Sequence, residues 1–178
     1  MAFGARLKGV LAICQPKQYQ LENLKLKQNP FIVILEGVEK PGNIGTVIRT
    51  ADGAGVDAVI LCNSKTDVYN HNIVRSSIGT IFTVPTIMVT PEETLQFLKS
   101  QNIKIFTTSA NTEKLYTTIN FKQPSAIIIG NEHTGVSSFW EEHAEAKIKI
   151  SMLGEASSLN AAMSASIIIY EALRQKMS

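Results

Sequence analysis

Residues 126–175 read AIIIGNEHTGVSSFWEEHAEAKIKISMLGEASSLNAAMSASIIIYEALRQ. An apolar run opens this stretch and breaks into GNEHTG at residues 130–135, and a second apolar run ends at Ile150. A long helix rich in small residues is predicted to follow, from Ser158 to Gln175. A glycine directly after a buried strand lets a ligand approach the backbone closely. The stretch therefore predicts alternating strands and helices, with a ligand site where the strands end.

The rest of the chain repeats this alternation. Short apolar runs bounded by turn residues predict buried parallel strands. Residues 90–93 (TPEE) are a strong helix start, because a capping residue is followed by proline and two acidic residues. The predicted strands are 31–35, 58–62, 81–84, 104–108, 125–129 and 147–150. One predicted helix begins at Asn43, and the others cover 70–77, 90–100, 137–144 and 158–175. No clear element is predicted for 109–124.

Strands separated by helices define the fold class as α/β, with a mainly parallel sheet and helices on both faces. The length of 178 residues suits one domain, which we expect to cover residues 29–178. Residues 1–28 are expected to be a short basic N-terminal extension that forms one or two small helices.

The charge is unevenly distributed. Residues 1–28 carry five basic residues and one acidic residue, a net charge of +4, whereas the rest carries 12 basic and 14 acidic residues, a net charge of −2. A basic leading segment, here with Arg6 and Lys8, can contact nucleic-acid phosphates. A solvated surface explains the same charges.

Membrane and metal proteins are disfavoured. The longest aliphatic runs, such as 31–35, are too short to span a bilayer, and residues 10–14 are short even for the core of a signal peptide. We therefore expect a cytoplasmic protein with no membrane association. Cys14 and Cys62 form neither a metal-ligand spacing nor a disulfide framework, and the three histidines show no ligand spacing, so we expect two reduced thiols and no metal.

A nicotinamide enzyme is the first alternative for this layout, but the glycine pattern disfavours it. The connection after the first strand reads GVEKPGNIG at residues 37–45, which is not the G-x-G-x-x-G fingerprint. The chain also has no Walker A lysine loop. Nucleotide-phosphate binding therefore lacks a recognisable cradle.

Candidate site residues lie in three segments. In the first, residues 36–51, Asn43 is suited to cap a helix, and Arg49 lies off the apolar stripe of that helix. The second, IIIGNEHTG at 127–135, places Glu132 at the end of a strand. The third is ISMLG at 150–154, followed by Ser-Leu-Asn at 158–160. Taken singly, these residues are also explained as a helix cap, a surface arginine and a turn with a solvated glutamate.

Together the three segments resemble the signature of the SpoU (TrmH-type) RNA 2′-O-methyltransferases of the SPOUT superfamily, over roughly residues 30–175. RSSIG at 75–79 is a weaker match, similar to an R-x-S-x-G stretch in that family. The chain departs from the family at Ser151, where proline is usual, and at residues 161–162, where Ala-Ala replaces the common Val-Ser. These departures concern the hydroxyl network around the cofactor.

The resemblance implies a reaction, a cofactor and a set of site residues. We expect methyl transfer from S-adenosylmethionine to a ribose 2′-hydroxyl of tRNA or rRNA, by a homodimer whose C-terminal region forms a deep trefoil knot. RNA would cross the dimer interface, with Arg49 beside the cofactor of the other subunit. The residues expected to be catalytic are Arg49, Glu132, Asn160 and Asn43. The residues expected to bind the cofactor are Gly130, Ile150, Leu159, Met152, Thr108, Ser109 and Ser158.

The role of Arg49 has two workable versions. The family's arginine is proposed to activate the hydroxyl, yet a guanidinium stays protonated at its usual pKa, above ~12. Either nearby charge and desolvation make a fraction of Arg49 neutral, or Arg49 holds the adjacent phosphate while another group or water takes the proton. Glu132 and Asn160 would then orient Arg49 and the ribose, and Asn43 would help to fix the first loop.

Two other functions are compatible with parts of the pattern. The runner-up is a non-catalytic RNA-binding dimer that retains the fold, which the departures at Ser151 and Ala162 favour and the four matching site residues disfavour. A third hypothesis is a methyltransferase with the same cofactor and a protein or small-molecule substrate. The basic leading segment and Arg49 disfavour that hypothesis.

Overall fold

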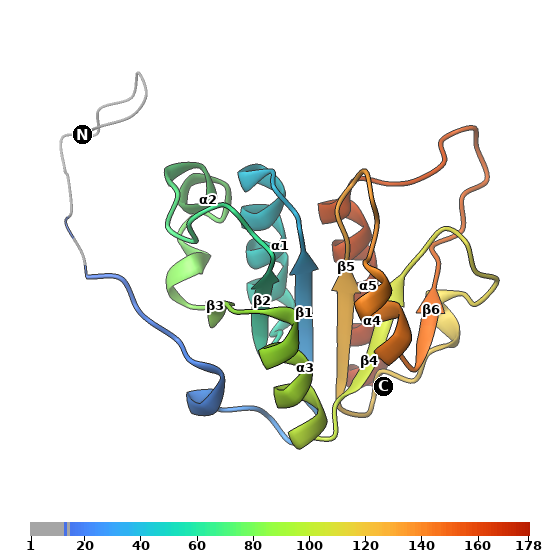
Figure 1. Cartoon of the computed structure of the whole chain (residues 1–178), viewed down its shortest axis with the longest axis horizontal. Coiled ribbons are helices and arrows are strands. Elements are labelled where there is room, and N and C mark those ends of the chain that lie inside the picture. Colours follow the sequence, from blue (N-terminus) through green and yellow to red (C-terminus); the bar gives the residue numbers. More distant parts are fainter. Residues whose placement is uncertain (1–12, 14) are drawn as a thin grey trace.

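A computed structural model describes residue 13 and residues 15–178 of the chain. Within these residues, six parallel strands form one sheet in the order β3-β2-β1-β5-β4-β6 (Figure 1). The strands are β1 Phe31–Glu36, β2 Ala58–Cys62, β3 Thr86–Met88, β4 Lys104–Thr108, β5 Ser125–Ile129 and β6 Ala146–Ile148. The helices are α1 Pro41–Ala54, α2 His71–Ser76, α3 Pro91–Ser100, α4 Ser138–His143 and α5 Ala161–Met177, with 3-10 turns η1 Leu21–Asn23, η2 Thr80–Phe82 and η3 Tyr116–Thr118.

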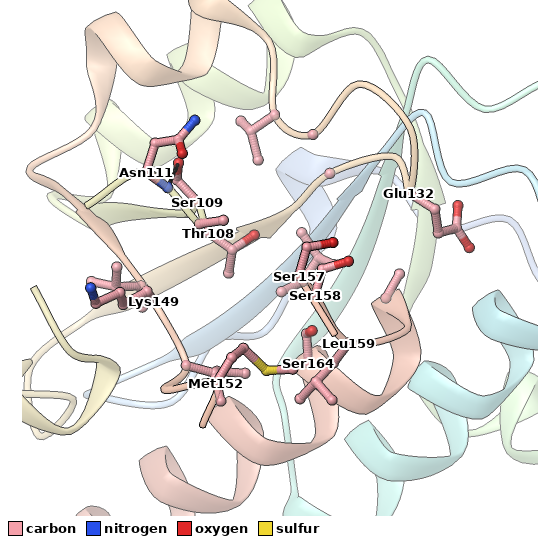
Figure 2. Close-up of a pocket in the computed structure, with 18 of the residues that line it drawn as sticks. Thr108, Ser109, Asn111, Glu132, Lys149, Met152, Ser157, Ser158, Leu159 and Ser164 are labelled. Atoms are coloured by element: carbon pink, nitrogen blue, oxygen red, sulfur yellow. Dashed lines mark hydrogen bonds between the residues drawn. The ribbon is translucent and has the colours of Figure 1, made fainter. Parts of the chain in front are cut away.

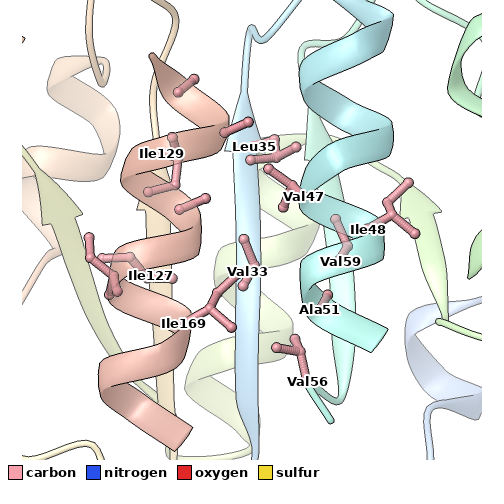
Figure 3. Close-up of a cluster of buried hydrophobic side chains, with 14 of the residues drawn as sticks. Val33, Leu35, Val47, Ile48, Ala51, Val56, Val59, Ile127, Ile129 and Ile169 are labelled. Atoms are coloured by element: carbon pink, nitrogen blue, oxygen red, sulfur yellow. The ribbon is translucent and has the colours of Figure 1, made fainter. Parts of the chain in front are cut away.

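Helices cover both faces of the sheet because the strand side chains alternate between two cores. Val33 and Leu35 of β1 point to the core shared with α1, α2 and α5, where α1 and α5 lie side by side (Figure 3). Ile32 and Ile34 point to the opposite core, which α3 and α4 cover. Every residue of β1 is buried, as expected for a central parallel strand. The predicted α/β class with a parallel sheet is confirmed, and the trefoil knot stays a prediction of the resemblance.

Local signals set the ends of several helices. Pro41 begins α1, and Gly55 ends it in the left-handed conformation, at a φ of 66°. Thr90 and Glu93 form the capping box of α3. Hydrogen bonds from the backbone and side chain of Thr90 hold the pKa of the Glu93 carboxyl below its usual value. The helix predicted from residues 90–93 therefore forms where its start signal lies.

The predicted strand at 81–84 is wrong. These residues lie in and after η2, and the edge strand β3 begins later, at Thr86. Ile81 and Val84 are both buried, at the three-residue spacing of a helical turn. The backbone N–H of Val84 bonds to the carbonyl of Thr80, so the apolar run closes a turn instead of extending.

Two predicted helix starts are also shifted. Asn43 is not the cap of α1, because the helix begins at Pro41 with Lys40 in the capping position, which leaves the Asn43 side chain available for other contacts. The last helix begins at Ala161 and not at Ser158, with Asn160 as its cap accepting a bond from the N–H of Ala162 at 2.9 Å. Strand β6 ends at Ile148, before the predicted end at Ile150, because Lys149 instead bridges to Leu115.

The leading segment is described only in part. Of residues 1–28, residues 1–12 and 14 lie outside the described residues, and with them the predictions for Arg6, Lys8 and Cys14. The described part contains η1, whose Leu21 packs in the core on the α3 side.

In β2, burial raises the pKa of the Cys62 thiol to about 12, so this thiol stays protonated at neutral pH.

Gly45 provides a test of how closely α1 packs on α2. A Cβ at Gly45 would lie 1.9 Å from Ser76 Oγ and 2.8 Å from the carbonyl oxygen of Ile73. We expect Gly45→Ala to lower the free energy of unfolding by about 1 to 3 kcal/mol, measured by urea denaturation, because such overpacking forces the helices apart. Gly42→Ala is the matched control on the same helix, since nothing lies within 4 Å of its added Cβ. Equal stability of the two variants would contradict this account of the packing.

Candidate active site at the carboxyl ends of the strands

A cavity of about 780 Å³ opens where β4, β5 and β6 end (Figure 2). Such a volume lies within the range of about 300 to 1,000 Å³ that is usual for small-molecule sites. Its walls come mainly from the connections after these three strands, of which the one after β6 leads into α5. The carboxyl ends of the strands are where open parallel sheets bind ligands, so the position agrees with the prediction from the glycine-containing loops.

The loop after β5 forms one wall and has a tightly folded backbone. Asn131 and Gly135 exchange two backbone hydrogen bonds, at 3.1 and 2.9 Å. A Cβ on Gly130 would lie 2.2 Å from the carbonyl carbon and oxygen of Gly135. Gly135 itself has a φ of 71°, in the left-handed region that glycine favours. Both glycines are therefore required by the shape of the loop.

Side-chain hydrogen bonds join three of the four predicted catalytic residues. The amide of Asn43 donates to Glu132 Oε1, and the amide of Asn160 donates to Asn43 Oδ1 at 3.2 Å. These residues come from α1, the loop after β5 and the cap of α5, which are far apart in the sequence. Glu132 lines the cavity, at the end opposite Asn111 (Figure 2).

Arg49 is not part of this cluster. It lies further along α1, is exposed, and does not line the cavity. Its guanidinium makes no hydrogen bond or ion pair with any described residue. The side chain is thus available to a ligand or to another chain.

All seven residues predicted to bind the cofactor line the same cavity. Thr108 ends β4, and the other six lie in the connections after β4, β5 and β6, the last of which leads into α5. In the part of the chain that the structure describes, residues 151–159 make no backbone hydrogen bond, so their N–H and C=O groups are available to a ligand or water. Leu159 is 36% exposed and contributes an apolar surface at the wall.

Further lining residues escaped the sequence prediction. Asn111 belongs to the irregular segment after β4, and Ser164 lies one turn beyond Asn160 on α5. Lys149 also lines the cavity and pairs with Glu113, with 3.0 Å between Nζ and Oε2. The helical spacing of Ser164 from Asn160 could have identified it, whereas the position of Asn111 depends on tertiary folding alone.

No described helix is both long and apolar enough to cross a bilayer. Among residue 13 and residues 15–178, no group of three or more His, Cys, Asp or Glu side chains is arranged to hold a metal ion.

Comparison with known proteins identifies the family. The model of the SpoU rRNA Methylase family matches residues 30–170, so the chain belongs to this family. It is 33% identical over 175 residues to a 23S rRNA (uridine(2479)-2′-O)-methyltransferase of Streptomyces viridochromogenes, which covers 95% of this chain and 61% of that protein. It is 35% identical over 176 residues to a Staphylococcus epidermidis protein that is named as a TrmH family tRNA/rRNA methyltransferase. This match covers 95% of this chain and 71% of that protein.

The fold also matches solved structures of this family. The SpoU methyltransferase AviRb from Streptomyces viridochromogenes, in complex with the cofactor AdoMet, superposes with a TM-score of 0.85 at 34% identity. The match covers 89% of this chain and 62% of that one. The chain therefore spans about three fifths of the length of the Streptomyces relatives.

Gly130→Ala tests whether the fold of this loop shapes the cavity. We expect the added methyl group to displace the 130–136 backbone and to weaken binding of S-adenosylmethionine by at least about tenfold, measured by calorimetric titration. Gly154→Ala is the control on the facing segment, because its added Cβ meets nothing within 4 Å. Unchanged affinity in a folded Gly130→Ala protein would exclude this wall from the ligand site.

Proposed function

We propose that the protein transfers a methyl group from S-adenosylmethionine to a ribose 2′-hydroxyl of tRNA or rRNA, in the cytoplasm. The observation that carries the proposal is the hydrogen-bonded cluster of Asn43, Glu132 and Asn160 beside the cavity. Membership of the SpoU rRNA Methylase family supports the same reaction class. Relatives named as 23S rRNA and tRNA/rRNA methyltransferases support an RNA substrate.

The cavity suits a nucleoside-containing ligand. Ile150, Met152 and Leu159 supply apolar surface for a flat base. Ser109 and Ser158 supply hydroxyl groups, and residues 151–159 supply unpaired backbone donors and acceptors. When bound there, S-adenosylmethionine would supply an electrophilic methyl group on a positively charged sulfur. We therefore infer that the seven predicted residues hold the cofactor mainly through backbone groups and apolar contact.

The cluster at the cavity is suited to orient a ribose. The amide of Asn43 holds one oxygen of the Glu132 carboxyl group, so this side chain has a defined direction. Asn160 is fixed twice, because its oxygen caps α5 and its amide reaches Asn43. In this arrangement Glu132 and Asn160 would place the hydroxyl, and the alignment of the reacting groups would supply much of the rate enhancement.

Arg49 is suited to hold the phosphate next to the reacting ribose. An exposed guanidinium with no partner among the described residues can present its fork of N–H groups to a phosphate in a bidentate contact. Its position outside its own cavity supports a site completed by a second subunit. The two versions of its role differ in whether Arg49 itself takes the proton.

Transfer of a labelled methyl group to unmodified tRNA and rRNA pools tests the proposed function. We expect the wild-type protein to label one of these pools, and Arg49→Ala to reduce the rate about 100-fold or more while S-adenosylmethionine affinity stays within a few-fold. Arg49→Lys keeps the positive charge but lacks the fork of N–H groups, so its transfer rate separates bidentate phosphate binding from the effect of charge alone.

Near-normal transfer by Arg49→Ala would show that Arg49 is not part of the site. Cofactor binding without transfer to any RNA would favour the non-catalytic RNA-binding protein, and transfer to protein or small molecules would favour the third hypothesis.

We further propose that two copies of the chain form a homodimer through the outer face of α5. Met163, Tyr170 and Met177 follow each other at seven-residue spacing on this helix, and they are 55%, 51% and 79% exposed. Exposed apolar side chains that recur along one face of a helix are typical of interaction surfaces. Gly53 of α1 borders this face, since its Cβ position lies 3.4 Å from the Tyr170 hydroxyl. The second copy would then lie next to the helix that carries Arg49.

Charges placed on this face test the dimer. We expect the double variant Met163→Asp, Tyr170→Asp to sediment as a monomer where the wild type sediments as a dimer, because an apolar interface cannot bury unpaired carboxylates. Met88→Asp is the control, since Met88 is also exposed but lies on the edge strand β3. A wild-type protein that is monomeric at micromolar concentration, or a double variant that stays dimeric, would contradict this interface.

A further inference from the structure

Glu36 is a buried acidic residue that none of the site predictions includes. It ends β1, is 5% exposed, and does not line the cavity. One of its carboxyl oxygens accepts a hydrogen bond from the backbone N–H of Ser137 at 2.8 Å, and the other accepts from the Ser137 hydroxyl at 2.6 Å. A buried carboxyl group is costly unless such bonds compensate its loss of water. The role of Glu36 therefore depends on what its partner, Ser137, does.

Ser137 uses its hydroxyl in an unusual way for its position. It is the capping residue of α4, where a serine side chain ordinarily accepts a bond from the first turn of the helix. Here the side chain makes no capping bond and donates to Glu36 instead. The contact thus attaches the end of the 130–137 loop to the end of β1. As a consequence, the first turn of α4 has no hydrogen bond from the Ser137 side chain.

The other end of the loop is attached to the same place. The side-chain amide of Asn131 donates to the carbonyl of Gly37 at 2.7 Å. Residues 36–37 therefore hold the loop at both Asn131 and Ser137. Glu132 lies between these two attachments and reaches Asn43 on the following helix.

We propose that Glu36 is a positioning residue: by holding Ser137 it sets the cavity wall and the direction of Glu132. The inference rests on the proposed function for its catalytic consequence, but the loop geometry is independent of that function. A carboxyl group suits this role because its two oxygens match the two donors of Ser137. Displacement of Glu132 by about 1 Å would be enough to slow a reaction that depends on alignment.

Hydrogen exchange tests the geometric part without any activity. In Glu36→Met, which keeps the length and removes both acceptors, we expect the hydrogen-bonded amides of residues 131, 133, 135 and 137 to exchange at least about tenfold faster than in the wild type. Ser137→Ala should show a smaller increase, since the backbone bond remains. Thr90→Ala, which removes the cap of α3 away from the site, should leave these amides unchanged even though it destabilises the protein. Unaltered exchange in both loop variants would overturn the proposal.

Kinetics test the catalytic part. At saturating RNA and cofactor we expect Glu36→Met to lower kcat at least about tenfold, and Glu36→Gln to restore most of it, because an amide can accept from the Ser137 N–H and donate to its hydroxyl. In a Glu132→Gln background, Glu36→Met should lower kcat less than twofold further, since both changes affect the same group. Independent, multiplicative losses would overturn the proposal.

The outcomes separate the two levels of inference. A wild-type protein with no transfer to any RNA defeats the proposed function and the catalytic role of Glu36 with it. An active wild type with an equally active Glu36→Met variant defeats the role of Glu36 alone. If Glu36→Met does not fold, Ser137→Ala decides, because a variant with normal exchange and normal kcat would overturn the proposal.

Discussion

The parallel pairing of β1 with β5 is the constraint on which the candidate site depends. The strands are far apart in the sequence but adjacent at the centre of the sheet, with Leu35 opposite Ile129. From β1 the chain continues to β2 and β3 on one side, whereas β4 and β6 lie on the other side of β5. The cavity lies on the β5 side of this pair, where β4, β5 and β6 end. The pairing therefore places residues 36–37 beside residues 130–137.

Close packing of α5 against α1 adds the third part of the site. Ala161, Ala162 and Ala165 are buried in the core that these helices share. The hydroxyl groups of Thr50 and Ser166 lie 3.1 Å apart across the contact. Small side chains allow this approach, and it brings the cap of α5 to Asn43. The small residues of α5 thus allow close packing against α1, and this packing sets the position of Asn160 in the site.

Signals confined to a few neighbouring residues predicted much of the fold. The apolar runs at 31–35, 58–62 and 126–129 form strands, and the start signal at 90–93 forms a capping box. The prediction failed where an apolar run had two possible periods, as at 81–84, which closes a helical turn before β3. It also failed for Asn43, where proline began the helix earlier and left the amide for Glu132. Such choices depend on neighbours that are distant in the chain.

The sequence by itself determined the fold class and the three segments that hold the candidate site, because strand runs, glycine breaks and helix caps are local properties. The seven residues expected to bind the cofactor lie at the end of β4 and in loops whose positions follow from strand order, and all of them line one cavity. Only the tertiary structure joined Asn43 to Glu132 and Asn160, left Arg49 outside that cavity, and placed the buried carboxyl group of Glu36 against Ser137. A hydrogen bond between residues about a hundred positions apart depends on how the strands pair, and no periodicity in the sequence records which strands become neighbours.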